Sequence, residues 1–166
     1  MGRMQLEMDD VNWRILALLQ ENARTSFSEI GRQVGLTSTA VAERVRRLED
    51  ARVVRSYRIA IGDEELGYPI NAFVTIAVHY GGAGQLLRLC AETPEIIECH
   101  HVTGDDAYLL RIRTTSVQYL EEIVQRLRRV GEPNASIVLS TPIEHKPLAR
   151  PTATREAPTP LRVRSA

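Results

Sequence analysis

The segment from Ser26 to Leu48 constrains the fold most, because it predicts two short helices separated by a glycine turn. Ser26 and Glu29 have the spacing of a capping box, in which both side chains accept hydrogen bonds from unpaired backbone N–H groups. Gly35 can adopt the left-handed conformation that ends a helix, and Gly31 is predicted to let the two helices approach closely. The second helix begins at a cluster of capping residues and has an inward apolar stripe, which consists of Val41, Val45 and Leu48.

A preceding helix is predicted from apolar residues at helical spacing. Either Asp9 or Asp10 can cap its start. Its apolar residues are Val11, Ile15, Leu18 and Leu19. Three helices of this kind form a helix-turn-helix reader, which lays its last helix in the major groove of duplex DNA. We therefore predict a DNA-binding domain over residues 8–60.

Polar side chains on the last of these helices are the candidate DNA contacts. The start of such a helix meets base edges, whereas arginines further along are better placed for phosphates. The residues near the start are Ser38, Thr39, Ala40, Glu43 and Arg44, and the arginines further along are Arg46 and Arg47. An arginine can grip guanine at two points or neutralise a phosphate. The same charges also suit a solvated helix face that binds nothing.

The rest of the chain predicts an α+β fold. Residues 53–61 are expected to form an extended strand, and the acidic stretch with glycine and proline at 61–70 a hinge. The elements expected next are a strand at 71–79, a helix at 83–92, strands at 96–102 and 107–114, a helix at 117–130 and a strand at 135–144. This order predicts a ferredoxin-like βαββαβ domain over residues 71–146, with both helices on one face of an antiparallel sheet.

The first strand of this domain is apolar on both faces, as its residues 72–78 read AFVTIAV. A sheet with one wet face alternates instead, so something besides the helices must cover the second face. Residues 137–139, Ile-Val-Leu, repeat the pattern in the last strand. The simplest cover is the same sheet of a second chain, which predicts a homodimer with an interface of roughly 1,600 Å².

The formal net charge of zero hides an uneven distribution. Residues 1–60 have a net charge of +2, residues 61–145 of −6, and residues 146–166 of +4. Basic ends and an acidic middle suit a chain whose ends meet a polyanion, so duplex DNA is the predicted partner. The last segment, 147–166, is rich in proline, threonine, alanine and arginine and is expected to be a disordered basic tail, either solubilising or auxiliary on DNA.

Membrane, disulfide and metal chemistry are not indicated. No apolar run reaches the roughly 20 residues of a membrane helix, and residues 1–10 lack the apolar core of a secretory signal, which predicts a cytoplasmic protein. Cys90 and Cys99 form no CxxC pair and are expected to be reduced and half-buried. His100 and His101 are neighbours on a strand and point to opposite faces, so no metal site is expected.

Two motifs are specific when they occur together: LTSTAVAERVRRLE at residues 36–49 and TGDDAYLL at residues 103–110. With them, the chain resembles the leucine-responsive and asparagine-responsive (Lrp/AsnC, feast/famine) transcription regulators over about residues 8–148. The resemblance implies a winged or extended helix-turn-helix, a hinge strand, and an effector-sensing domain that dimerises through its sheet. It further implies that dimers assemble into tetramers or octamers, and that amino acids bind where dimers meet.

The loop after the strand at 96–102 is the candidate effector site. Its small, polar, turn-forming residues let backbone amides face a ligand carboxylate, although an ordinary hairpin turn has the same character. The candidate effector-binding residues are His101, Thr103, Gly104, Asp105 and Asp106. Ala107 stands where the family has a second aspartate, which would help to receive a ligand ammonium. The predicted effector is a small metabolite of the amino-acid class.

Three functions are compatible with these residues. The leading one is a sequence-specific DNA-binding transcription regulator that is not an enzyme and needs no cofactor. Siroheme decarboxylase subunits resemble the same two-domain fold, and histidines near the sheet could hold a tetrapyrrole or relay protons. The basic recognition helix, which an enzyme would not require, favours the regulator. An architectural DNA-compacting protein would need the oligomer and the basic surfaces, but no effector.

Overall fold

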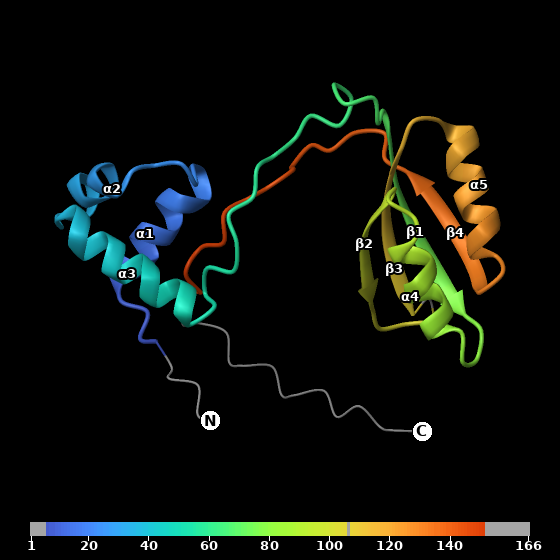
Figure 1. Ribbon diagram of the computed structural model, residues 1–166, viewed down its shortest axis with the longest axis horizontal. Helices are drawn as coiled ribbons and strands as arrows, with labels where there is room; N and C mark the ends of the chain where they lie inside the picture. Colours follow the sequence, from blue (N-terminus) through green and yellow to red (C-terminus); the bar gives the residue numbers. More distant parts are fainter. Residues whose placement is uncertain (1–5, 106, 152–166) are drawn as a thin grey trace. The chain divides into compact units, whose positions relative to one another are not determined.

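The computed structural model describes residues 6–105 and 107–151. Contacts divide these residues into two compact units, 6–59 together with 145–151, and 60–144 (Figure 1). Within the described residues, every helix is too short or too polar to cross a membrane.

The described part of the first unit forms three helices, α1 (Asp10–Glu21), α2 (Phe27–Val34) and α3 (Ser38–Asp50). Each begins at a side-chain cap. Asp9 accepts from the backbone N–H of Asn12 at 2.7 Å, and Ser26 and Thr37 accept in the same way in α2 and α3. The three helices enclose one apolar core of Ile15, Leu18, Leu19, Ile30, Val41, Val45 and Leu48. The predicted helix-turn-helix is therefore confirmed.

The turn between α2 and α3 depends on two glycines. Gly35 has a φ of +71°, in the left-handed region that ends α2 as predicted. Gly31 has a different role from the expected one, because a Cβ there would lie 2.4 Å from the backbone oxygen of Leu36. The backbone N–H of Leu36 also donates to the carbonyl of Gly31 at 2.9 Å. Gly31 therefore makes room for the backbone of the turn. It does not mainly serve the packing of α2 against the body of α3.

The strand expected at 53–61 is absent, since the described residues from 51 to 69 form only turns and irregular backbone. The N–H groups of Val53 and Val54 both donate to the carbonyl of Leu48, at 2.9 and 3.1 Å, which closes the end of α3. Beyond them Ile59 is 81% exposed. A strand needs a neighbour for its backbone hydrogen bonds, and no described segment of this chain pairs with these residues.

The second unit contains β1 (Ile70–Val78), α4 (Ala83–Ala91), β2 (Ile96–His101), β3 (Tyr108–Thr114), α5 (Val117–Leu127) and β4 (Gly131–Ile137). The strands form an antiparallel sheet in the order β2-β3-β1-β4. Residues of both helices share one buried cluster with alternate residues of β1 and β3, so the helices cover the same face. This is the predicted α+β, ferredoxin-like arrangement.

Strand β4 differs from the prediction, because it begins at Gly131, four residues earlier than expected, and ends at Ile137. The shift follows from tight packing, since a Cβ on Gly131 would lie 2.3 Å from the carbonyl oxygen of Ala77. Pro133 is tolerated because β4 is an edge strand. After the last backbone bond, from Val138 to Asn71, the chain leaves the sheet, and Leu139 is 95% exposed.

The chain after the second unit returns to α1. The Gln20 side chain exchanges hydrogen bonds with the backbone N–H and carbonyl of Leu148, at 2.8 and 3.3 Å, and Arg150 pairs with Asp10. The beginning of the predicted tail is therefore held against the first unit. Residues 152–166 of that tail lie outside the described residues.

Candidate functional site

The seven predicted DNA contacts lie on α3, which presents them away from its buried stripe. Thr37 forms the cap of α3, so the side chains of Ser38 and Thr39 are not needed for capping. Both are exposed in the first turn. Ala40, Glu43 and Arg44 are half-buried, whereas Arg46 and Arg47 are exposed. The helix thus offers small polar groups at its start and guanidinium groups further along.

Arg44 is held by the start of α1. Its Nη1 donates to Asp9 Oδ2 at 2.7 Å and to Asn12 Oδ1 at 3.0 Å. Asn12 is buried, and its amide donates to the carbonyl of Glu7 at 3.2 Å. The backbone N–H of Asn12 and the guanidinium of Arg44 lower the pKa of Asp9. Asp9 therefore caps α1 and fixes α3 with one carboxylate.

Sequence reasoning missed this anchor. It placed Arg44 among the base contacts and gave Asn12 no role. The signal was weak, because Asp9 and Arg44 are 35 positions apart and only the packing of α1 on α3 brings them together.

Glu43 is bound by both exposed arginines. Arg46 donates to its carboxylate at 3.0 Å and Arg47 also at 3.0 Å, and these bonds lower the pKa of Glu43. Water and salt screen exposed ion pairs of this kind, so they contribute little to stability. A DNA phosphate can therefore replace Glu43 as the partner of either arginine at small cost. Next to this group lies an open hollow of about 380 Å³, whose lining includes Asp9, Arg44 and Arg47.

The predicted effector residues lie on the connection between β2 and β3. Thr103, Gly104 and Asp105 are exposed, and Gly104 has a φ of +112°, which a glycine adopts most readily. At the base of this loop, the rings of His101 and Tyr108 stack with centroids 4.8 Å apart. Asp106 lies outside the described residues. The loop is a glycine-containing hairpin turn beside an aromatic pair.

Both domains of the chain are similar in sequence to known proteins. A sequence profile of the AsnC-type helix-turn-helix domain matches residues 8–49, and one of the Lrp/AsnC ligand binding domain matches residues 71–148. The HTH-type transcriptional regulator LrpB of Bacillus subtilis is 32% identical over 126 residues, which cover 76% of this chain and 85% of LrpB. The chain belongs to the Lrp/AsnC family.

Two solved Lrp/AsnC-like structures are also similar. Regulator NMB0573 of Neisseria meningitidis, in complex with L-Met, is 26% identical with a TM-score of 0.80, over 86% of this chain and 96% of that one. The feast or famine regulatory protein Rv3291c of M. tuberculosis, complexed with L-methionine, is 30% identical with a TM-score of 0.74, over 83% and 96%. The chain is therefore a DNA-binding transcription regulator of this family, which favours regulation over the tetrapyrrole enzyme.

The sheet of this Lrp/AsnC chain has an open face, opposite α4 and α5, and the face is more polar than predicted. Phe73 of β1 is 38% exposed there, with the guanidinium of Arg111 at 5.8 Å from its ring centroid. Glu98 binds Arg111 and His100, both at 3.1 Å, and Arg113 pairs with Asp63. Sequence reasoning saw the apolar residues of β1 but missed the arginines that β3 places beside them.

Some polar atoms on this face are buried without a partner. Among the described residues, they include Asn71 Oδ1 and the Nε atoms of Arg111 and Arg113. A buried polar atom without a hydrogen bond costs free energy, so packing arginine stems on this face has a local cost within the single chain.

Proposed function

We propose that this regulator binds specific duplex sequences through α3, and that an amino acid shifts this binding. The observation that carries the proposal is the exposed face of α3. There the small side chains of the first turn are followed by two arginines, which pair with just Glu43 and Asp50 among the described residues. The proposed site of action is the cytoplasm.

Each part of α3 has a separate task in this mechanism. Ser38 and Thr39 read base edges, since the start of a recognition helix enters the groove first. Arg46 and Arg47 leave Glu43 and bind phosphates, which fixes the register without reading sequence. Arg44 keeps its bonds to α1 and sets the angle of α3. We therefore assign Arg44 a positioning role, in place of the base contact expected from the sequence.

Replacing Arg47 with alanine should weaken DNA binding and make it less dependent on salt. Each neutralised phosphate contributes about 0.9 to the slope of log K against log salt concentration, so the slope should fall by about that amount. The measurement is fluorescence anisotropy of a labelled duplex over a range of salt concentrations. Arg128→Ala, in the second unit, is the control and should keep the parent slope. An unchanged slope in Arg47→Ala would remove this residue from the contacts.

The effector is proposed to bind at the loop between β2 and β3. The two solved structures described above are complexes with L-methionine, which supports an amino acid as the ligand class. In this chain the exposed turn at Thr103–Asp105 can present backbone N–H groups to a carboxylate. Ala107 has no carboxylate to bind the ligand ammonium. Asp105, in the same loop, is the described carboxylate that is proposed to bind it instead.

Replacing Asp105 with alanine should weaken the effect of the amino acid on DNA affinity. Coupling between two such sites is typically about 1–3 kcal/mol, or roughly 5- to 150-fold in affinity, and most of it should disappear. The measurement is duplex affinity with and without each member of an amino-acid panel. Glu122→Ala on α5 is the control. If no amino acid changes the melting temperature or the duplex affinity of the parent protein, the sensing role is wrong.

The active form is proposed to be a dimer formed through the open face of the sheet, with further assembly to tetramers or octamers. The exposed ring of Phe73, which lies on the open face next to Arg111, supports this surface. Two copies of α3 would then meet successive major grooves, as dimers of helix-turn-helix proteins do.

A further inference from the structure

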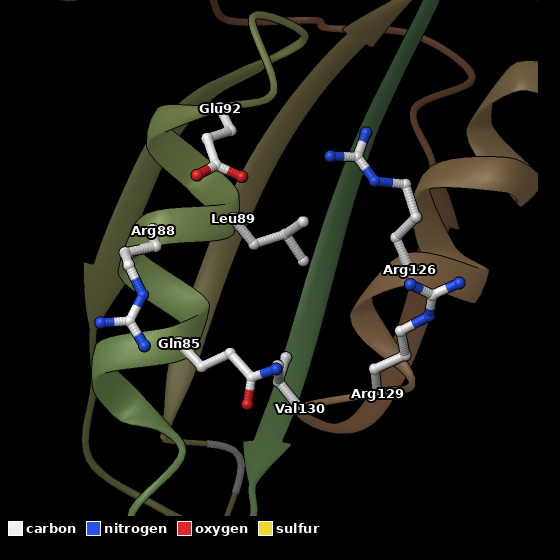
Figure 2. A pocket seen from close by; sticks show the side chains of 7 residues that line it. All are labelled: Gln85, Arg88, Leu89, Glu92, Arg126, Arg129 and Val130. Atoms are coloured by element: carbon white, nitrogen blue, oxygen red, sulfur yellow. The ribbon is translucent and has the colours of Figure 1, made fainter.

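A groove on the helix-covered side of the second unit has no role in DNA binding or in the effector loop. It lies between α4 and the end of α5 and has a volume of about 190 Å³ (Figure 2). Its lining residues are Gln85, Arg88, Leu89, Glu92, Arg126, Arg129 and Val130. In Figure 2 Leu89 extends from α4 toward α5, while Arg126 and Arg129 rise from the opposite side.

The basic residues of the second unit are unevenly placed. Residues 61–145 contain 12 acidic and 6 basic side chains. Arg111 and Arg113, on the sheet, are paired with Glu98 and Asp63. The other four lie at positions 88, 126, 128 and 129, and three of these line the groove. Within the described residues, no carboxylate lies within 4.0 Å of their guanidinium groups, although acidic side chains are twice as numerous.

Favourable helix dipoles alone do not explain this arrangement. Basic residues near a helix C-terminus stabilise it by about 0.3–1 kcal/mol each, and Arg88 and Arg126 lie in the last turns of α4 and α5. That effect does not require arginines of two helices to line one groove. Three arginines and one carboxylate, Glu92, line the groove, so the lining has a net positive charge that a bound anion would balance.

We propose that this groove binds a small multivalent anion, a phosphorylated or polycarboxylate metabolite, as a ligand separate from the amino acid. The planar guanidinium groups of Arg126 and Arg129 offer paired N–H donors that match carboxylate and phosphate oxygens. Gln85 adds an amide donor from α4, and Leu89 and Val130 supply an apolar wall for a carbon skeleton. The volume of the groove suits a compact metabolite better than a macromolecule.

The test is isothermal titration of the full chain with pyrophosphate and, separately, with citrate, at matched ionic strength. Saturable binding of pyrophosphate indicates a phosphate ligand, saturable binding of citrate a polycarboxylate, and either supports the proposal. The double variant Arg126→Gln with Arg129→Gln should weaken binding at least roughly tenfold, as expected when charge-assisted hydrogen bonds are lost. The single variants Arg126→Gln and Arg129→Gln should each weaken binding more than Arg128→Gln, the matched control, which removes the same single charge outside the groove lining.

A second variant tests the proposal independently if the double variant fails to fold. Gln85→Glu places a negative charge in the groove and should also weaken binding, while circular dichroism shows whether each variant keeps its helices. The proposal is overturned if neither probe binds saturably to the parent. It is also overturned if Arg128→Gln weakens binding as much as the double variant, since the response then reports net charge alone.

Discussion

Replacing Gly31 with alanine should lower the free energy of unfolding of the helix-turn-helix unit by about 1–3 kcal/mol. The added Cβ would lie 2.4 Å from the backbone oxygen of Leu36. This oxygen cannot move aside easily, because the N–H of the same residue is bonded to the carbonyl of Gly31. Relief of the overlap must therefore shift the turn and change the tilt of α3, so duplex binding should fall together with stability.

Urea unfolding followed by the fluorescence of Trp13 measures this effect, since Trp13 is the only tryptophan and lies on α1. Gly84→Ala is the matched control, because Gly84 is also helical but a Cβ there meets nothing within 4 Å. Followed by circular dichroism, the control should keep its stability or gain about 0.5–1 kcal/mol. An unchanged urea midpoint in Gly31→Ala would show that the turn has room to relax.

Replacing Phe73 with aspartate should separate the proposed dimer into monomers. Truncating a buried aromatic anchor in an interface often costs about 2 kcal/mol or more. A two-fold interface contains the residue twice, so the loss is about 4 kcal/mol, or roughly a thousandfold in the dimer dissociation constant. The introduced carboxylate should also draw Arg111 away from Glu98, which it now bonds at 3.1 Å.

Size-exclusion chromatography with light scattering measures the mass of each variant. Leu87→Asp is the control, because Leu87 is also a large apolar residue and is exposed on α4, on the other side of the domain. This control should keep the mass of the parent assembly. If Phe73→Asp keeps the parent mass while Leu87→Asp loses it, the chains associate through the helices and the open sheet face is not the interface.

Features set by short stretches of sequence could be predicted well. The caps at Asp9 and Ser26 and the left-handed Gly35 depend on residues no more than four positions apart. The buried stripe of α3 follows from its helical period alone. In the second unit, apolar patterns predicted the order and type of all the elements, although the bounds of β4 were wrong, because each element buries one side against the same core.

Features set by contacts between distant segments could not be predicted. The length of β4 depends on the close approach of Gly131 to β1, and the segment at 53–61 lacks a neighbour to make it a strand. The anchor of Arg44 joins two helices, and the groove between α4 and α5 combines residues about 40 positions apart. Periodicity reports which face of an element is buried, but not which side chain of another element it meets.

The proposed regulatory function requires paired copies of α3 that bind duplex DNA. The most direct test is sedimentation of a fluorescent duplex from the gene's own upstream region with the purified protein at low ionic strength. We predict that the duplex sediments in complexes that contain an even number of chains. A protein that sediments as a single chain and leaves the duplex free would contradict the account.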